Sequence, residues 1–335
     1  MKKYMKFAAA SLILSLALLL SAGCGLSGTR KEEPVSDTGF YFDTVVKITL
    51  YGVKDDSLIR ECFARMAEYE SMLSRTREGS DVWNINHSQG LPTNVSADTA
   101  FLIKTALHYA EISDGVFDIT IAPVTDLWSF EGEGEHDLPD AEKIKEALTH
   151  VDYHQIELEG SAVTLKDPEA AIDLGGIAKG YIADRLKEFL VSQGITSGII
   201  DLGGNLLTIG TKPDGTPWKL GVRKPFAQTA SDLSATVTAN GLSLVTSGTY
   251  ERYFEKDGTL YHHILDKNTG YPAKTGLSSV SILSGSSVDG DALSTTCFLL
   301  GPDKGMALIE SLEDTEALFI TGDGNLLHSS GFPCE

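Results

Sequence analysis

The segment DLGGIAKGYIAD, residues 173–184, contains residue types that bind phosphate in proteins. Gly175 and Gly176 let the backbone approach a ligand closely, and a helix predicted over 177–193 would turn its free N–H groups toward an anion. Lys179 in the first turn opposes the helix dipole unless a negative charge lies beside it. The glycine spacing matches neither a P-loop nor a dinucleotide-binding fingerprint. Taken alone, the segment is more simply a strand-to-helix turn with a solvated lysine.

A second segment offers oxygen ligands for a cation. Residues 286–301, SSVDGDALSTTCFLLG, place Asp289, Asp291, Ser294 and Thr295 at the start of an apolar helix. Asp and Ser are ordinary helix caps at such positions. Asp291 and Thr295 are one helical turn apart, however, so both side-chain oxygens can face one point. A carboxylate, a hydroxyl and backbone carbonyls suit Mg²⁺, which takes few protein ligands and completes its shell with phosphate and water.

The net charge gives a reason for a bound cation. The 335-residue chain has a formal charge of -20 at pH 7. A surface this acidic repels nucleic acid, which disfavours a function in DNA or RNA binding. A phosphate-bearing ligand meets the same repulsion, and a bound metal ion is the simplest way to overcome it.

A histidine pair is the third candidate for chemistry. Residues 261–272, YHHILDKNTGYP, predict a strand followed by a turn at Gly270 and Pro272. Adjacent residues of a strand point to opposite faces, so at most one of His262 and His263 faces a site. A histidine there is usually structural, but beside a metal-bound phosphate it becomes a candidate general base.

The elements that must position these residues predict one α+β domain. Apolar residues recur at helical spacing over 57–75, and a capped helix runs from Ser96 or Asp98 to about Ser113. GVFDITIAPV, residues 115–124, predicts a buried turn and strand. Further helices are predicted at 141–149, 288–300 and 303–312, and strands fill much of the second half. Helices interleave with largely antiparallel mixed sheets, rather than forming a regular βαβ series.

The first residues predict a targeting segment. A basic start, MKKYMK, precedes the apolar stretch FAAASLILSLALLL, which is too short and wrongly flanked for a spanning helix. The following Ala-Gly-Cys resembles a bacterial lipobox, in which Cys24 becomes the lipidated first residue; the alternative is an ordinary signal peptide with an incidental cysteine. We therefore expect a lipoprotein signal peptide at 1–23, a lipidated tether at 24–38 and the folded domain at 39–335.

Seven segments together resemble the ApbE family, the FAD:protein FMN transferases, including its lipoprotein members. The resemblance covers roughly residues 40 to 330 and implies a single ApbE-like domain. Each segment is weakly specific, whereas seven in this order are highly specific. The segments are FDTVVKITLYG, GVFDITIAPV, IDLGGIAKGYIAD, DLGGNL, TSGTYERYF, HHILDKNTGYP and DALSTTCFLLG.

The resemblance implies a Mg²⁺-dependent transferase with FAD as substrate. Family members split FAD at its pyrophosphate, join FMN to a threonine or serine hydroxyl of a target protein through a phosphoester, and release AMP. With a lipid anchor at Cys24, the protein would lie on the extracytoplasmic face of the cell membrane and modify exported or membrane-bound acceptors. Two alternatives stay open: a Mg²⁺-dependent FAD pyrophosphatase that yields FMN and AMP, and a flavin-binding lipoprotein without catalysis.

The resemblance also implies roles for individual residues. The metal would be held by Asp291, Thr295 and the backbone carbonyl of Gly176, and a contribution from Ser294 is left open. Phe42 stands where relatives often have methionine. The implied flavin contacts are Phe42, Val116, Phe117, Asp118, Asp173, Lys179 and Ile264.

A target hydroxyl is a poor nucleophile until it loses its proton, so a base is needed beside the phosphorus. His263 is the predicted catalytic base, His262 is the second choice, and Asp266 is the third.

Overall fold

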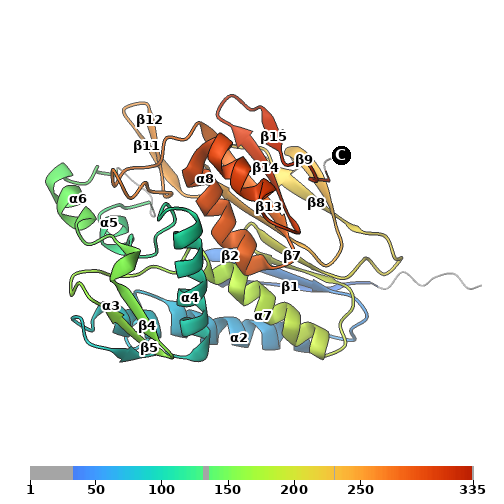
Figure 1. Cartoon of the computed structure of the whole chain (residues 1–335). Coiled ribbons are helices and arrows are strands. Elements are labelled where there is room, and N and C mark those ends of the chain that lie inside the picture. The colour runs from blue at the N-terminus through green and yellow to red at the C-terminus, as the bar shows by residue number, and fades with distance from the viewer. Residues whose placement is uncertain (1–32, 131–135, 230, 334–335) are drawn as a thin grey trace, which may run out of the picture. The chain divides into compact units, whose positions relative to one another are not determined.

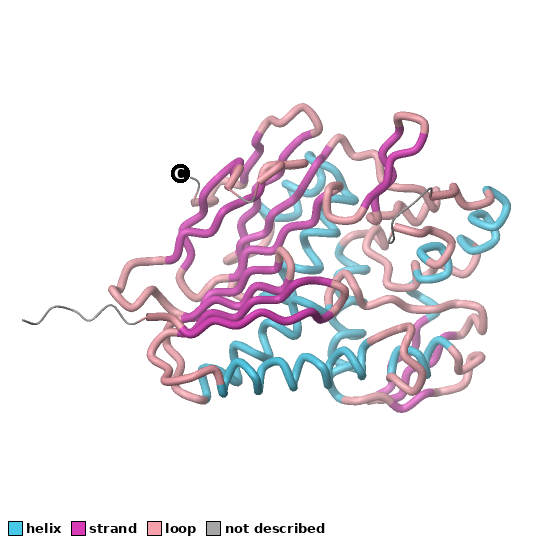
Figure 2. The backbone as a smooth tube through the Cα atoms, turned by 180° about the vertical axis from the view of Figure 1, so that it is seen from behind, coloured by secondary structure: helices cyan, strands magenta, loops and turns pink. Residues whose placement is uncertain are grey.

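The structure is a computed structural model that describes residues 33–130, 136–229 and 231–333. An eight-stranded sheet, antiparallel between all neighbours, forms the centre of the unit Pro34–Glu335 (Figures 1 and 2). This confirms the predicted α+β class. In sheet order, its strands are β1 (Val35–Tyr41), β2 (Thr44–Leu50), β6 (Gly198–Leu202), β7 (Asn205–Ile209), β10 (Ser243–Gly248), β13 (Leu277–Ser284), β14 (Thr315–Thr321) and β15 (Leu326–His328).

Helices cover one face of this sheet, which is seen from its other side in Figure 2. Along β14, Ala317 and Phe319 pack into the core shared with the helices, while Leu318 and Ile320 pack into a second core on the opposite face. The alternation follows from the two-residue period of a strand. The helices of this layer are α2 (Ser57–Leu73), α4 (Ala97–Ile112), α7 (Ala178–Ser192) and α8 (Ser287–Glu310).

The second core is closed by the hairpin of β8 (Trp218–Arg223) and β9 (Leu233–Ala239). The other elements lie together on one side of the sheet, to the left in Figure 1. They are α3 (Asp81–Asn86), α5 (Ala122–Thr125), α6 (Ala141–Leu148), the 3-10 turn η1 (Tyr153–Gln155), the small sheet of β3 (Thr93–Asn94), β5 (Ala162–Leu165) and β4 (Ile156–Glu159), and the hairpin of β11 (Tyr253–Lys256) and β12 (Thr259–His262).

The helices predicted from apolar periodicity are confirmed, including the two predicted at 288–300 and 303–312. They meet at a kink inside α8, where Gly301 adopts φ 78° and ψ 179° and Pro302 follows. Proline has no N–H to donate to the preceding turn, so the helical hydrogen bonds are interrupted there.

Two expectations were wrong. The strand predicted within 115–124 does not form; the segment is a buried turn followed by α5, with one isolated parallel bridge between Ile121 and Ala171. Phe117, Ile119, Ala122 and Val124 are buried, so the apolar pattern reflects burial and not strand pairing. The first strand also begins at Val35, inside the predicted tether 24–38, because β1 pairs with β2 over its whole length.

The predicted signal peptide 1–23 and the lipidation site Cys24 lie outside the described residues. Among the residues that are described, the structure contains no helix with the length and apolar character needed to cross a membrane.

Candidate active site

The glycine turn between Leu174 and α7 packs against two of the predicted site residues. A Cβ atom placed on Gly176 would lie 3.4 Å from the Phe117 ring and 3.8 Å from the Thr295 hydroxyl oxygen. The main chain at Gly176 therefore lies between a predicted flavin contact and a predicted metal ligand. Segments separated by more than a hundred residues meet here, as the predicted site requires.

Asp291 lies at the centre of this arrangement and is only 5% exposed. Its Oδ2 accepts a hydrogen bond of 2.8 Å from the Gly180 N–H, and the Lys179 N–H also donates to the carboxylate. Burial raises the pKa of Asp291, while the nearby Lys179 ammonium acts in the opposite direction. A buried carboxylate of this kind is costly unless a positive charge compensates it.

The helix α7 does not offer its first N–H groups to a ligand, contrary to the sequence-based expectation. Ala178 donates to the Leu174 carbonyl, and Lys179 and Gly180 donate to Asp291. These donors are already satisfied inside the protein. A phosphate bound at this site would therefore need another positive partner, such as the Lys179 side chain.

Thr295 is the more open of the two predicted side-chain ligands. Its hydroxyl lies 3.2 Å from the hydroxyl of Ser247, which also lies 2.8 Å from that of Ser294. Ser294 is fully buried and donates to the Asp291 carbonyl, so its hydroxyl is used within the protein. Ser247, on β10, was not predicted as a site residue, although it belongs to the TSGTYERYF segment.

The donor set fits Mg²⁺ only together with a substrate. Among the described residues, no group of three or more His, Cys, Asp or Glu side chains could hold a metal ion. One carboxylate, the hydroxyls of Thr295 and Ser247, and the nearby Gly176 backbone are hard oxygen donors. Mg²⁺ characteristically completes such a partial shell with phosphate oxygens and water.

The Lys179 ammonium lies near several charged groups around these candidate metal ligands. Its Nζ lies 3.4 Å from the Gly175 carbonyl, and its charge acts on both Asp291 and Glu251. The Glu251 side chain reaches solvent, but the protein around it raises the pKa by desolvation, against the charges of Lys179 and Arg223. Both its carboxylate oxygens would lie 3.9 Å from a Cβ on Gly204, so the second DLGG segment reaches this region too. Sequence reasoning missed Glu251.

His263, the predicted base, is half-buried, and its main chain and ring both contact Arg252. The His263 N–H donates to the Arg252 carbonyl at 3.1 Å, and ring Nδ1 lies 3.3 Å from the same oxygen. A carbonyl only accepts, so Nδ1 carries the proton and Nε2 keeps a lone pair. Burial lowers the pKa of His263 to about 3, assisted by the Arg252 charge, which keeps the ring neutral at pH 7.

His262 points the other way and is only 5% exposed. Nε2 lies 3.1 Å from the Ala273 carbonyl, Nδ1 accepts from the Ile264 N–H at 3.3 Å, and the ring packs edge-on against Phe298. Burial lowers its pKa to about 4. With both nitrogens occupied, His262 is a structural residue of the core.

Asp266, the third choice, organises the turn that follows. Its carboxylate accepts from the main chain and side chain of Asn268 and from the Thr269 hydroxyl. Ile264, a predicted flavin contact, is buried, and its carbonyl accepts from Ala273. Of the three candidate bases, His263 has the most suitable free atom.

Asp173 and Phe42 are anchored by partners that were not predicted. One oxygen of Asp173 accepts from the Gly175 N–H at 2.7 Å, and the other pairs with Arg75 Nε at 3.2 Å. The Asp173 side chain therefore holds the glycine turn that follows it, and Arg75 holds Asp173. Phe42 lies in the turn between β1 and β2 with φ 53°, and its N–H donates to Glu70 at 2.7 Å.

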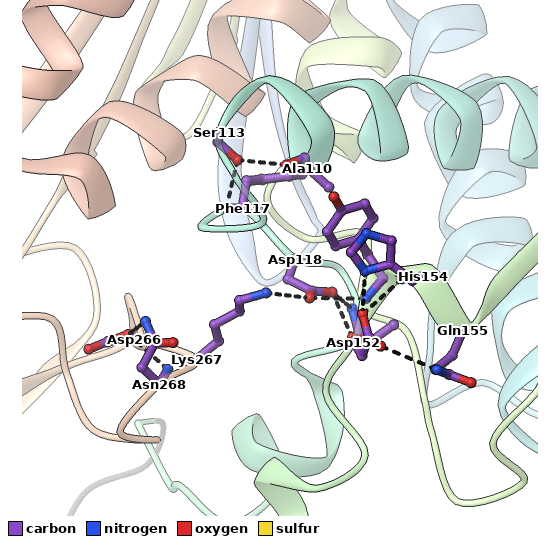
Figure 3. A network of polar contacts seen from close by, with 12 residues as sticks. Ala110, Ser113, Phe117, Asp118, Asp152, His154, Gln155, Asp266, Lys267 and Asn268 are labelled. Atoms are coloured by element: carbon purple, nitrogen blue, oxygen red, sulfur yellow. Dashed lines mark hydrogen bonds and ion pairs between the residues drawn. The ribbon is translucent and has the colours of Figure 1, made fainter.

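Asp118 lies in a polar network that joins three segments (Figure 3). Its oxygens accept from the N–H and hydroxyl of Thr120 at 3.0 and 2.6 Å, from the Tyr153 N–H at 3.1 Å, and from Lys267 Nζ at 3.1 Å. The side chain is therefore engaged within the protein, and a flavin contact here would use the backbone. The network also links the Phe117 turn to the loop that follows His263.

Val116 and Phe117 are held by the end of α4. The N–H groups of the two residues donate to the carbonyl and hydroxyl of Ser113, at 3.2 and 3.1 Å respectively. Val116 is half-buried and Phe117 is buried, with its ring edge toward Gly176. The structure thus brings the Phe117 turn to the predicted metal ligands.

A comparison with protein-family models matches residues 42–319 of this chain to the ApbE family. The chain belongs to the ApbE family. Among curated relatives, the FAD:protein FMN transferase of Klebsiella pneumoniae is 40% identical over 82% of this chain and 86% of the relative. That of Treponema pallidum is 33% identical over 94% of this chain and 93% of the relative.

Solved ApbE structures share the fold. The ApbE protein of Thermotoga maritima superposes with a TM-score of 0.83 at 33% identity, covering 90% of this chain and all of that one. The flavin transferase ApbE of Vibrio cholerae gives 0.78 at 29% identity, covering 90% and 98%. These matches confirm the predicted family, fold class and assignment as a flavin transferase.

The buried His262 makes the stability of this ApbE protein depend on pH. Its pKa is about 4 when folded and near 6.5 when unfolded, so the folded state binds fewer protons between these values. Stability is therefore full above pH 6.5 and falls toward pH 4, by about 3 kcal/mol for this group. Replacing it, His262→Gln, should flatten the fall in urea unfolding midpoints between pH 7 and 4.5.

The exposed His108 on α4 provides the control. His108→Gln should retain the fall in stability between pH 7 and 4.5, because His262 is still present. Equal pH slopes for His262→Gln and the wild type would contradict the interpretation of His262 as a buried neutral group.

Proposed function

We propose that this ApbE protein uses Mg²⁺ to transfer FMN from FAD to a threonine or serine hydroxyl of a protein acceptor, with release of AMP. The observation that supports this most strongly is the buried Asp291 carboxylate, which accepts from the Lys179 and Gly180 N–H groups and lies one helical turn from Thr295. The names of the curated relatives support the reaction.

Asp291, Thr295 and the Gly176 backbone would hold the Mg²⁺, with Ser247 beside Thr295. When bound, Mg²⁺ supplies neutralisation of charge on the pyrophosphate. Lys179, whose charge acts on Asp291, would add a second positive charge. The Phe117 ring, which lies close to Gly176, would place the flavin half of FAD.

His263 would remove the proton of the acceptor hydroxyl through Nε2. Its Nδ1 contact to the Arg252 carbonyl fixes the tautomer and the direction of the ring. A pKa of about 3 makes the free ring a weak base. Phosphate charges bound nearby would raise that pKa, so the ring becomes a better base when FAD is present.

The metal role is tested with Asp291→Ala and with chelation. We expect EDTA to lower AMP release from FAD by roughly a hundredfold or more because it removes the cation, and Asp291→Ala to do the same because it removes the carboxylate that would bind the cation. Asp303→Ala, an exposed acidic residue on the same helix, is the matched control and should retain activity. Undiminished turnover in EDTA would refute the metal role.

The same assay separates transfer from hydrolysis. With an acceptor protein present, flavin fluorescence should stay on the denatured acceptor. Release of free FMN at the same rate with and without acceptor would favour the FAD pyrophosphatase instead. Tight FAD binding without AMP release would favour a flavin-binding protein.

The role of His263 is tested by His263→Ala. We expect the rate of FMN transfer to fall by about 10²–10⁴-fold, the usual loss for a general base, while FAD affinity changes little. His108→Ala is the control. If His263→Ala transfers FMN at the wild-type rate, the base is another group.

We also propose that the protein is a lipoprotein anchored through Cys24 on the extracytoplasmic face of the cell membrane, where exported or membrane-bound acceptors are within reach. The lipobox-like sequence before Cys24 supports this. Cys24→Ser should move the protein from the membrane fraction to the soluble fraction of cells, as measured by immunoblotting. A variant that stays fully membrane-bound would argue against the anchor.

A further inference from the structure

The first turns of α7 and α8 approach each other closely, next to the candidate metal ligand Asp291. A Cβ on Gly180 would lie 2.2 Å from the Ser287 carbonyl oxygen and 2.7 Å from the Val288 Cα. No larger residue fits at this contact without backbone movement. The two helices therefore approach each other as closely as their main chains allow, at the turn of α7 that contains Lys179.

Each helix caps the other with a carboxylate. Asp184 of α7 accepts from the Ser287 and Val288 N–H groups of α8, each at 2.9 Å. Asp291 of α8 accepts from the Gly180 N–H of α7 at 2.8 Å. The exchange is reciprocal, and each acceptor lies within the second turn of its own helix.

The two carboxylates compensate for the weak capping that each helix receives from its own N-cap residue. The N-cap of α7 is Ile177, which has no side chain able to cap, and the Ser286 hydroxyl at the start of α8 accepts from Asp289 at 3.4 Å. The N-termini of helices carry partial positive charge, so two of them side by side repel. The carboxylates of Asp184 and Asp291 offset this repulsion.

We propose that Asp184 is a positioning residue, which holds the α8 turn bearing Asp291 and Thr295 at a fixed place relative to Lys179 on α7. Asp184 has hydrogen bonds to the start of α8, through which it acts on the site. The Lys187 ammonium, one turn further along α7, donates to the Gly241 carbonyl at 2.7 Å and anchors the same helix. The effect of Asp184 on ligand binding rests on the proposed function, because Asp184 positions the residues that are assigned to Mg²⁺ and pyrophosphate.

The test compares wild type, Asp184→Asn and Asp303→Asn as full-length protein. Asparagine has the size of aspartate but presents an NH₂ group to one of the two α8 N–H donors. In metal-free protein, hydrogen exchange at Ser287 and Val288 should accelerate about five- to tenfold in Asp184→Asn, the effect of losing one cap. The exposed Asp303→Asn should exchange as the wild type does.

Two ligand measurements distinguish positioning from a purely structural role. The FAD dissociation constant in EDTA, from flavin fluorescence, and the half-saturating Mg²⁺ concentration in a thermal-shift titration with FAD should both rise about fivefold or more. At saturating FAD and Mg²⁺, the rate of AMP release should recover to within a few-fold of wild type. Ligand affinities equal to the wild type, in a variant of lower melting temperature, would overturn the proposal.

If Asp184→Asn does not fold, a variant that keeps the charge, Asp184→Glu, provides the test. Asp184→Glu retains a carboxylate but displaces it by one methylene, so we expect a folded protein with the same direction of change in both affinities; wild-type affinities would overturn the proposal. If Mg²⁺ has no effect on the wild type, the proposed metal role fails, and the FAD affinity in EDTA still decides the role of Asp184.

Discussion

The site depends on a negative charge that the fold removes from water. Asp291 is buried at the junction of two helix N-termini, where the Lys179 and Gly180 N–H groups contact its carboxylate. An ionised carboxylate in such a place is stable only with hydrogen bonds and nearby positive charge. The helix ends meet the first need, and the charge of Lys179 contributes to the second. The proposed Mg²⁺ would complete this compensation, so its affinity would depend on how incompletely the protein alone satisfies Asp291.

The strongly acidic composition of the chain makes the few positive charges near Asp291 important. A chain with a formal charge of -20 must concentrate positive charge wherever a dinucleotide is to bind. Lys179 is placed to act on Asp291, Glu251 and His263 together. Since the first N–H groups of α7 are used internally, little else among the contacts of the glycine turn offers an anion a positive partner. In the proposed function, phosphate recognition and catalysis would therefore depend on the same few charges.

Local sequence patterns predicted the parts of the site that lie on single elements. The placement of Asp291 and Thr295 one turn apart follows from helical periodicity, and the expectation that at most one of His262 and His263 faces a site follows from strand periodicity. The ordered segments of the family added the expectation that these parts meet. The choice between the two histidines needed the fold, because only packing against Phe298 shows which face is the core.

The contacts that sequence reasoning missed join distant segments. Ser247, Glu251 and Asp184 contribute through partners on other elements, and no local pattern distinguishes them from ordinary polar residues. The strand expected within 115–124 failed for a related reason. Alternating apolar residues report burial, but they do not report whether a neighbouring strand is present to pair with.

The kink at Gly301 bears on how α8 can vary. In an unbroken helix, inserting one residue rotates everything beyond it by about 100°. Because Gly301 leaves the helical conformation, the directions in which the side chains of 302–310 point are independent of the helix before the kink. The orientation of the half that contains Asp291 and Thr295 is therefore set by its own packing against α4, α7 and the sheet. Changes in length beyond the kink can therefore be absorbed without rotating the Asp291 carboxylate away from Lys179 and Gly180.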